Sequence, residues 1–255
     1  MERNLQELVI LYCDLNTLSQ EQIRHMEEVI SDGRKVRLRP SMSHQKRLQH
    51  LVAGYLLEMY LSKAGYPAIF SYKTHNSGKP YLEFADGTKA PHFSLSHSGH
   101  YAICAISNNL VGIDIEDKDY GEDDDARRNR LQRIANRFFT EGERDYLTYY
   151  PEEFYQLWTY KEAVAKAFNK PIMEVLSGED YRLVLEKIQD VDMSQGDEVE
   201  EHIFLVKTSI QVEDERNSTI ENAKPFTNTT LFSEYYRLTK APFVGFLVDK
   251  GREQS

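Results

Sequence analysis

The chain has 255 residues, 40% of them hydrophobic and 28% charged, as in a globular protein with one large domain or two small ones. Its net charge of −10 excludes a general nucleic-acid-binding surface, and no apolar run reaches the length of a membrane span. The amino terminus lacks the layout of a signal peptide, so we expect a cytoplasmic protein. Two cysteines, Cys13 and Cys104, lie in apolar runs and are expected to be buried free thiols.

The first part of the chain combines two predicted core elements with a basic run. The apolar residues from Leu8 to Tyr12 predict a strand, and helix-forming residues from Gln20 to Ile30 predict a helix. From Arg34 to Arg39 the sequence packs four cations into six residues. Such a run is either a solvated face or, in a chain this acidic, the rim of a phosphate-binding site.

The stretch from Ser43 to Ser62 predicts an amphipathic helix, because apolar residues recur at helical spacing along it. The residues expected to face the core are Leu48, Leu51, Val52, Tyr55, Leu56 and Met59. Arg47 and His50 lie near its start, where they are either exposed surface residues or part of an anion site at the helix N-terminus.

A turn and a short strand follow, and they place polar residues at a strand end. The Asn, Ser, Gly and Pro content predicts a turn from His75 to Pro80. From Phe93 to Gly99, apolar residues alternate with serines as on a strand. Ser96 and His97 suit hydrogen bonding to an anion. Nucleophilic catalysis by this serine is the weaker alternative, because no third orienting residue is visible.

The most informative stretch runs from Leu110 to Glu116 and alternates as a β-strand. Its valine and isoleucines face one side, and Gly112, Asp114 and Glu116 face the other. The two carboxylates, roughly 6–7 Å apart, can converge on one hard cation such as Mg²⁺. The alternative is an acidic edge strand that faces solvent. We expect this strand to form an antiparallel hairpin with an apolar strand from Tyr101 to Ile106.

A loop and a second key helix are predicted next. The charge mixture from residue 117 to 130 has no apolar period, which predicts a loop leading into a helix. From Glu153 to Phe168 an apolar helical stripe includes Lys161, expected to bury its stem and keep its ammonium in water. Glu162 and Lys166 lie one turn apart beside this stripe. They form either an ordinary surface pair or a pair that points into a cleft.

Strands are predicted to close the fold. Ile203 to Val212 alternates like a strand, and Leu231 to Leu238 with Pro242 to Val248 predicts a hairpin. The second half thus repeats the first in outline, a long helix followed by a two-stranded ribbon. The predicted division is an N-terminal half, residues 1–111, and a pseudo-duplicate C-terminal half, residues 112–255, with an extra acidic and polar segment at 177–228.

Four blocks stand in order along the chain: Gly78 to Pro80, Phe93 to Ser98, Gly112 to Glu116, and Trp158 to Lys166. In this order and at these separations they resemble the 4′-phosphopantetheinyl transferase superfamily, in particular its larger single-chain type. That type activates peptide and polyketide synthases of secondary metabolism. The resemblance covers roughly residues 45–170. It implies an α+β fold, a pseudo-twofold pair of similar α/β halves with the active site in the cleft between them.

The resemblance also implies a reaction. Enzymes of this family transfer 4′-phosphopantetheine from coenzyme A to a serine of an apo acyl or peptidyl carrier protein and release adenosine 3′,5′-bisphosphate. By the motif match, Asp114, Glu116 and Glu162 look like the three ligands of Mg²⁺, or alternatively of Mn²⁺. Lys166 looks like the lysine that contacts the coenzyme A phosphates. Glu162, directly or through a metal-bound water, is the candidate base, so Glu162 and Lys166 are the candidate catalytic residues.

The remaining implied contacts concern coenzyme A. Ser96 and His97 look like contacts to its pyrophosphate or 3′-phosphate, and Gly78, Lys79 and Pro80 look like the adenosine-pocket turn. The basic residues implied near the 3′-phosphate fall among Arg34, Lys35, Arg39, Arg47 and His50, and the candidates taken forward are Arg39 and Arg47. The expected partners are coenzyme A and the carrier protein, with no nucleic acid or membrane, and the expected state is a monomer.

Two other hypotheses stay open on the sequence. The first is another divalent-metal enzyme that processes nucleotides or pyrophosphate, which would turn over nucleotide without a carrier. The second is a non-catalytic module that binds coenzyme A or a carrier without Mg²⁺-dependent turnover. The intact set of Asp114, Glu116, Glu162 and Lys166 argues against the second hypothesis, because a dead relative could lose any of them freely.

Overall fold

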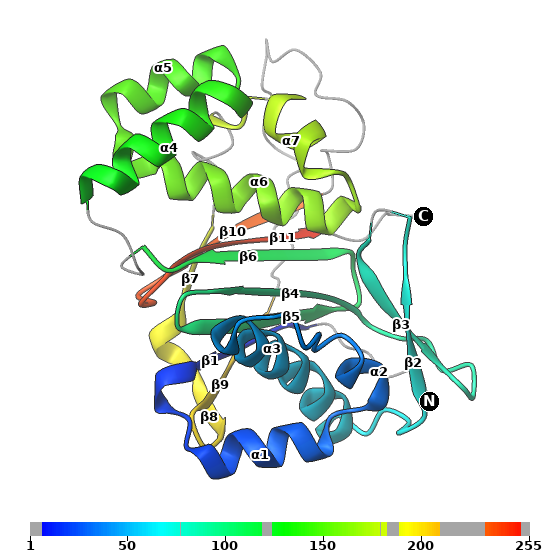
Figure 1. The fold of residues 1–255 in the computed structure, drawn as a ribbon. Coiled ribbons are helices and arrows are strands. Elements are labelled where there is room, and N and C mark those ends of the chain that lie inside the picture. Colours follow the sequence, from blue (N-terminus) through cyan, green and yellow to red (C-terminus); the bar gives the residue numbers. More distant parts are fainter. Residues whose placement is uncertain are drawn as a thin grey trace.

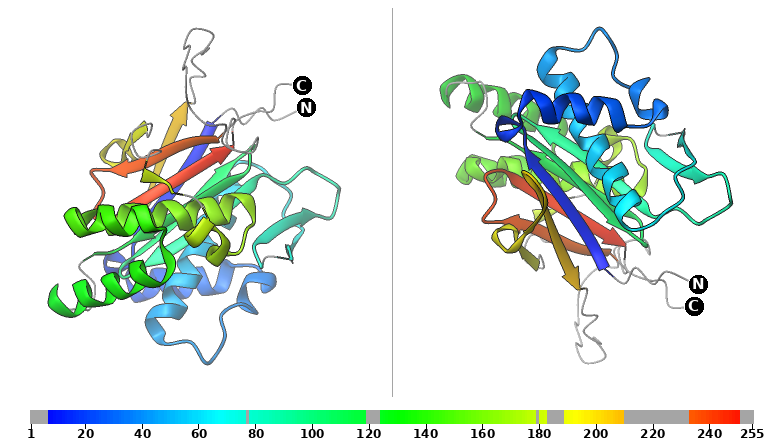
Figure 2. Two further views of the ribbon diagram at one scale, coloured as in Figure 1. Left: turned by 90° about the horizontal axis from the view of Figure 1, so that it is seen from above. Right: turned by 90° about the horizontal axis from the view of Figure 1, so that it is seen from below.

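A computed structural model of the chain describes residues 7–76, 78–118, 124–178, 180–182, 189–209 and 233–250. Within them, the fold is a mixed α+β arrangement in which two β-sheets lie between two groups of helices (Figure 1). The first sheet has the strand order β4-β5-β1-β9-β8, and the second has the order β6-β11-β10-β7. A separate ribbon, β2-β3, stands at one side. Figure 2 shows the same layers from two further directions.

The strands are β1 (Glu7–Asp14), β2 (Phe70–Thr74), β3 (Pro80–Phe84), β4 (His92–Ser98), β5 (Tyr101–Ser107), β6 (Val111–Glu116), β7 (Gln189–Asp192), β8 (Asp197–Glu200), β9 (Ile203–Ser209), β10 (Ser233–Thr239) and β11 (Val244–Lys250). The helices are α1 (Gln20–Val29), α2 (Asp32–Lys35), α3 (His44–Lys63), α4 (Asp124–Phe138), α5 (Glu141–Tyr149), α6 (Phe154–Phe168) and α7 (Ile172–Gly178). Helices α1 to α3 lie on one side of the sheets and α4 to α7 on the other (Figure 1).

The helix predicted from Ser43 to Ser62 is confirmed as α3, which covers the first sheet. Ser43 caps its N-terminus, since the serine side chain accepts a hydrogen bond from the Lys46 N–H. Its middle, residues 51–57, is buried on every side, so it is a core helix rather than an amphipathic one. The predicted strand near Leu8 and the predicted helix near Gln20 are confirmed as β1 and α1. Cys13 and Cys104 are buried free thiols, also as predicted.

Strand β6 is buried on both faces, and the two faces contact different parts of the fold. Its Val111, Ile113 and Ile115 pack against the first sheet. The opposite face lies against α6, because Gly112 has no side chain there: an added Cβ would lie 2.0 Å from the Ala163 carbonyl oxygen. This close approach brings the α6 backbone directly over the strand that carries the two carboxylates.

The predicted hairpin of Tyr101–Ile106 with the acidic strand is wrong. Strand β5 pairs with β4 and β1, whereas β6 leaves the first sheet and pairs with β11 in the second. The cause is burial: the isoleucine face of β6 packs onto the inner face of the first sheet, which a continuing hairpin would not allow. The charged stretch before Arg130 is also not all loop, since α4 begins at Asp124.

The closing hairpin is confirmed as β10 and β11, which pair antiparallel. The strand predicted from Ile203 is confirmed as β9 over its described residues, but it joins the first sheet beside β1. Strands β8 and β9 therefore belong to the sheet of the N-terminal half, and the division at residue 111 stays a prediction. Much of the extra segment at 177–228 lies outside the described residues. Among those described, no helix combines the length and apolarity that crossing a membrane requires.

The contact at Gly112 gives a test of the fold. We expect Gly112→Ala to destabilise the protein by more than about 1–3 kcal/mol, because the new methyl group meets helix backbone that cannot rotate away. The matched control is Gly178→Ala, since that exposed glycine has no atom within 4 Å of an added Cβ. Urea unfolding of both variants checks this. Equal stabilities would contradict the close packing of α6 on β6.

Candidate active site

The two sheets are joined at their edges by three serines. The edge strands β4 and β6 lie side by side (Figure 1). Ser94 Oγ accepts a hydrogen bond from the Ile113 N–H at 3.1 Å, and Ser96 Oγ accepts from the Ile115 N–H at 3.4 Å. Ser98 Oγ donates to Glu116 Oε2 at 2.8 Å. Alternate residues of β4 thus satisfy the edge of β6 in place of a normal backbone ladder.

Asp114 is the centre of this seam. Its Oδ1 accepts a hydrogen bond from Ser96 Oγ at 2.7 Å and forms an ion pair with Lys166 Nζ at 2.6 Å. Lys166 Nζ also lies 3.1 Å from Ser96 Oγ and 3.2 Å from the Ile113 carbonyl oxygen. The Asp114 side chain is 8% exposed and that of Lys166 is 28% exposed, so solvent reaches the lysine more readily. One carboxylate therefore links β4, β6 and α6.

Glu116 has polar groups from three elements near it. Ser98 donates a hydrogen bond to it, and the Trp158 indole and the Arg130 charge lower its pKa. Burial, reinforced by the negative charge of Asp114, outweighs them and raises the pKa of Glu116. Trp158 itself stacks on Phe154 with ring centroids 6.0 Å apart. A stacked aromatic group therefore lies near the second carboxylate of β6.

Glu162 brings a third carboxylate to the same region. Burial, together with the charges of Asp114 and Glu116 and against the opposing charge of Lys166, raises the pKa of Glu162 to about 7. Helix α6 packs closely on β6 at Gly112, so Glu162 lies on the helix that covers the acidic strand. All three carboxylates are at least partly shielded from water.

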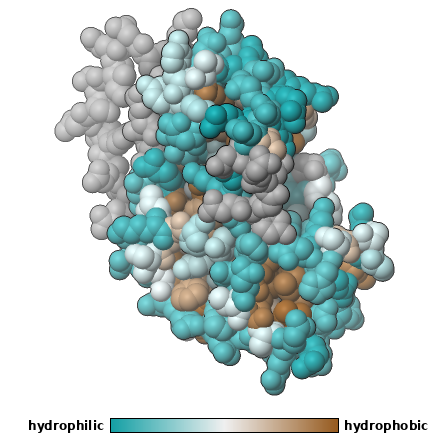
Figure 3. All heavy atoms as spheres, turned by 60° about the vertical axis from the view of Figure 1, so that its left-hand side comes forward, coloured by the Kyte–Doolittle hydropathy of each residue, from teal (hydrophilic) through white to brown (hydrophobic). Residues whose placement is uncertain are grey.

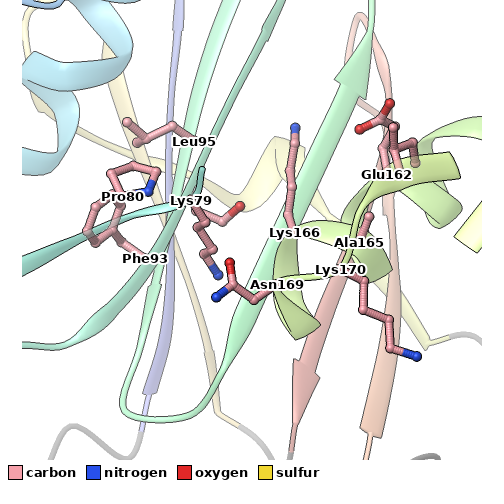
Figure 4. A pocket seen from close by; sticks show the side chains of 11 residues that line it. Lys79, Pro80, Phe93, Leu95, Glu162, Ala165, Lys166, Asn169 and Lys170 are labelled. Carbon is pink, nitrogen blue, oxygen red and sulfur yellow. The ribbon is translucent and has the colours of Figure 1, made fainter. Parts of the chain in front are cut away.

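A cavity of about 270 Å³ opens beside these residues. Figure 4 shows Lys79, Pro80, Phe93 and Leu95 on one wall and residues of α6 and its C-terminal end on the other. The α6 side consists of Glu162, Ala165, Lys166, Asn169 and Lys170, with Ile172 and Ser94 completing the lining. The cavity is partly apolar and carries three lysines, which suits a ligand with a flat ring and several phosphates.

The Gly78 turn contributes to this cavity through its neighbours. Gly78 has a φ of 93°, in the region that favours glycine, and its N–H donates to the His75 carbonyl oxygen. Lys79 Nζ donates to the Val111 carbonyl oxygen at 2.9 Å, so the turn is attached to β6. Burial and the nearby charge of Lys166 lower the pKa of Lys79 to about 8.

Ser96 and His97 point to opposite faces of β4, as neighbours on a strand do. Ser96 faces Asp114, whereas the His97 ring lies 4.6 Å from the ring of His50 on α3. Burial and neighbouring positive groups lower the pKa of His97 to about 3 and that of His50 to about 4. A serine–histidine nucleophile is therefore not assembled here, because Ser96 donates to an aspartate instead.

The basic run divides into buried and exposed members. Arg34 is 4% exposed, donates from Nη2 to the His50 carbonyl oxygen at 2.6 Å, and has a buried Nε without a hydrogen-bond partner among the described residues. Arg47 donates to the Leu38 carbonyl oxygen and pairs with Glu27 at 3.1 Å. Arg39 is exposed. Neither Arg39 nor Arg47 lines the cavity, and their role at a 3′-phosphate stays a prediction.

Lys161, the neighbour of Glu162, does not have a solvated ammonium, contrary to the sequence prediction. It is fully buried, and its Nζ lies 2.9 Å from Glu143 Oε2 and 2.8 Å from the Leu176 carbonyl oxygen. Glu143 is fully buried too and accepts a hydrogen bond from the Tyr181 N–H. Polar groups of the neighbouring helices pair with the Lys161 ammonium and allow its burial. The spacing of apolar residues along one helix cannot predict such partners, because they belong to other helices.

Sequence reasoning missed several groups at the site. These are Ser94, Ser98, the Trp158 indole, Arg130 and Asn169. The regular spacing of Ser94, Ser96 and Ser98 was the available signal, since three serines on one strand face require polar partners opposite. Asn169 ends α6 in a left-handed conformation, φ 61°, a common position for asparagine.

The donor set at this site fits a hard divalent cation. Within the described residues, no group of three metal-ligating side chains is already drawn together. Burial raises the pKa of both Glu116 and Glu162, and the negative charge of Asp114 adds to both shifts. A cation with oxygen ligands would relieve the repulsion between carboxylates.

Several known proteins are similar to this chain. A family model for the 4′-phosphopantetheinyl transferase superfamily matches residues 110–220, which include the acidic strand and the whole of α6. A 4′-phosphopantetheinyl transferase of Bacillus subtilis is 29% identical over 193 residues, covering 68% of this chain and 81% of the relative. The chain is thus similar to the 4′-phosphopantetheinyl transferase superfamily.

Two further relatives support this assignment. The 4′-phosphopantetheinyl transferase Sfp of Bacillus subtilis strain 168 is 28% identical over 181 residues, which cover 68% of this chain and 75% of the relative. The 4′-phosphopantetheinyl transferase HetI of a Nostoc species is 31% identical over 115 residues, 43% of this chain and 46% of the relative. The similarity to these transferases indicates that the protein is an enzyme, and it supports a phosphopantetheinyl transfer as the general reaction.

The buried ion pair of Lys161 and Glu143 gives a test of how α6 is attached to the neighbouring helices. We expect Lys161→Met to destabilise the transferase by about 3–5 kcal/mol, because it leaves the Glu143 charge buried without its cation. The double variant Lys161→Met/Glu143→Gln should recover part of that loss, since no uncompensated charge remains. Urea unfolding of the single and double variants checks both. A fully additive double variant would show that the two charges do not depend on each other.

Proposed function

We propose that this protein transfers 4′-phosphopantetheine from coenzyme A to a serine hydroxyl of an acyl or peptidyl carrier protein, with Mg²⁺, and releases adenosine 3′,5′-bisphosphate. The observation that carries the proposal is the arrangement of α6 on β6. Lys166 pairs with Asp114, and Glu162 lines the same cavity as Lys166, together with further lysines and apolar side chains; these contacts support the proposal.

The cavity is the proposed site for coenzyme A. Phe93, Leu95 and Pro80 offer apolar surface for the adenine ring, whose burial contributes affinity. Lys79, Lys166 and Lys170 offer cations for the phosphates. Lys166 faces both Asp114 and the cavity, so it can hold the diphosphate next to the carboxylates.

Asp114, Glu116 and Glu162 are the residues proposed to hold Mg²⁺, with Mn²⁺ as an alternative metal. A bound divalent cation would offset the repulsion between three carboxylates and a diphosphate and stabilise the charge that develops on the leaving phosphate. Ser96 donates a hydrogen bond to Asp114 and Ser98 donates one to Glu116, which orients these two carboxylates.

In the proposed reaction the serine oxygen of the carrier forms a bond to the phosphorus that bears pantetheine. The bond from that phosphorus to the bridging oxygen breaks, and adenosine 3′,5′-bisphosphate leaves with the electron pair. The serine proton passes to Glu162, directly or through a water molecule. Lys166 donates to the phosphate oxygens as their charge increases. The proposed enzyme acts as a monomer and needs no nucleic acid or membrane.

A carrier assay tests the proposal. The protein, coenzyme A, Mg²⁺ and several apo carriers are mixed, and the carriers are weighed by mass spectrometry. We expect a mass gain of one phosphopantetheine, and we expect Asp114→Asn to slow transfer by more than about 100-fold, since metal-assisted charge stabilisation is worth several kcal/mol. Glu83→Gln, at an exposed pair with Lys73 outside the cavity lining, is the matched control and should leave the rate unchanged.

Each failure of this assay has a distinct meaning. Nucleotide turnover without any carrier would replace the proposal by a pyrophosphate-processing enzyme. Binding of coenzyme A without any Mg²⁺-dependent turnover would favour a non-catalytic binding module. Near-normal turnover by Asp114→Asn, with an unchanged fold by circular dichroism, would mean that the metal site has been misplaced.

The chain also contains its own reporter of metal binding. Trp158 is the only tryptophan of the protein, and its indole is near enough to Glu116 to lower the pKa of that carboxylate. Binding of Mg²⁺ at Glu116 should therefore change the intrinsic fluorescence in a saturable way. We expect the change to disappear in Glu162→Gln, which keeps the tryptophan. A wild-type response that survives unchanged in that variant would place the metal elsewhere.

A further inference from the structure

Helix α6 ends at Asn169, whose backbone takes the left-handed conformation with φ 61° and ψ 32°. Its N–H donates to the Ala165 carbonyl oxygen, and the Lys170 N–H donates to the same oxygen at 3.0 Å. Glycine suits such a position at least as well as asparagine, because it has no Cβ to strain there. The helix end therefore fixes the backbone of Asn169, but it gives no reason for the side-chain amide.

The amide of Asn169 lies in the cavity of the candidate active site. Asn169 lines this cavity together with Lys79, Pro80 and Phe93 of the opposite wall. In Figure 4 its side chain points from the end of α6 toward the wall that carries Lys79. Asn169 is half-buried, so a ligand in the cavity can reach the amide while part of the surrounding water is excluded.

Asn169 lies at the end of the cavity away from the carboxylates. Helix α6 runs antiparallel to β6: Trp158, early in the helix, lowers the pKa of Glu116, and Lys166, late in the helix, pairs with Asp114. Asn169 follows Lys166 by three residues, which is about 4.5 Å further along the helix axis. A diphosphate held at Lys166 therefore has Asn169 on the side remote from Glu116, where another part of the same ligand must lie.

The chemistry of Asn169 differs from that of its neighbours. Among the described residues that line the cavity, Asn169 has the only side-chain amide, beside three lysines, one glutamate and one serine. Lysines attract phosphates by charge, whereas a neutral amide offers a hydrogen-bond acceptor next to a donor. Adenine offers the matching pair, an amino group next to a ring nitrogen, and asparagine can pair with both. The apolar side chains of Pro80 and Phe93 suit the flat face of the same base.

We propose that Asn169 recognises the adenine base of coenzyme A and selects it over other bases. Its Oδ1 accepts a hydrogen bond from the 6-amino group, and its Nδ2 donates to the neighbouring ring nitrogen. This inference rests on the proposed function and adds to it the residue that selects the base. A base without the amino group leaves Oδ1 without that hydrogen bond in a half-buried site, which lowers affinity. Asn169 is thus a specificity residue and takes no part in phosphoryl transfer.

A double-mutant cycle between protein and ligand tests this. The probe is a coenzyme A analogue whose base is purine, which lacks only the 6-amino group. With the wild-type protein and a saturating carrier, the KM of the analogue should be at least about tenfold above that of coenzyme A. In Asn169→Gly, which keeps the backbone conformation, the two KM values should lie within about twofold of each other. The kcat should stay within about threefold, because Asp114 is held by Ser96 and Lys166 instead.

Two further variants control for effects on the fold. His202→Gly changes another residue of positive φ, 65°, outside the cavity lining, and it should keep the discrimination. His202 lies between β8 and β9 (Figure 1), on the side that Figure 3 brings forward and that is mostly hydrophilic. Asn169→Asp keeps an oxygen acceptor and loses the donor. It should still discriminate against the analogue, while its charge repels the phosphates and raises both KM values.

The outcomes separate the two proposals. Absence of transfer by the wild-type protein to any carrier defeats the proposed function itself. Normal transfer with equal KM values for coenzyme A and the analogue overturns base recognition alone. Undiminished discrimination in Asn169→Gly would assign the recognition of the base to another residue. Lost discrimination in His202→Gly would reduce the effect to a change of the backbone, and either result overturns the role of Asn169.

A binding measurement tests Asn169 without the transfer reaction. Calorimetry compares adenosine 3′,5′-bisphosphate with the 3′,5′-bisphosphate of purine riboside, each in the presence of Mg²⁺. The Kd of the purine compound should be at least about tenfold higher with the wild-type protein, and within about twofold with Asn169→Gly. This ratio is independent of turnover, so it decides the role of Asn169 even if the carrier assay fails. Equal Kd values with the wild-type protein would contradict the recognition of adenine.

Discussion

The structure depends on one carboxylate that three elements share. Asp114 accepts hydrogen bonds from Ser96 of β4 and from Lys166 of α6 while it stands on β6. A buried carboxylate is costly unless it is paired, so these partners cannot move away independently. The same contact that stabilises the junction of the two sheets thus places an acid and a lysine of α6 beside the acidic strand. Structural and functional demands on Asp114 coincide.

Backbone geometry makes this junction possible. Without a side chain at Gly112, α6 can approach β6 closely enough for its Glu162 and Lys166 to reach the strand carboxylates. On the far side of α6, the buried pair of Lys161 and Glu143 holds the helix against α5 and α7. The helix is consequently fixed from both sides. A site fixed in this way has little freedom to rearrange, as an electrostatic mechanism requires.

Much of this could be predicted from the sequence. Alternation along residues 110–116 identified the acidic strand, and helical spacing identified α3 and the face of α6 with Glu162 and Lys166. The pairing of β6 could not be predicted, because a short apolar strand fits either sheet and the choice depends on packing between distant residues. The burial of Lys161 was missed for the same reason: its partner, Glu143, belongs to another helix. Local sequence patterns predict which residues form a strand or a helix. Which strand or side chain each one pairs with depends on tertiary contacts.

The central claim is that Asp114, Glu116 and Glu162 gather around one divalent ion that also contacts the diphosphate of coenzyme A. Anomalous diffraction from crystals containing Mn²⁺ and coenzyme A measures this most directly, because manganese alone gives the strong signal. The account predicts a single strong peak within about 2.0–2.6 Å of a carboxylate oxygen of each residue or of a bridging water. A peak bound to other residues, or a well-ordered diphosphate with no metal beside these three carboxylates, would contradict it.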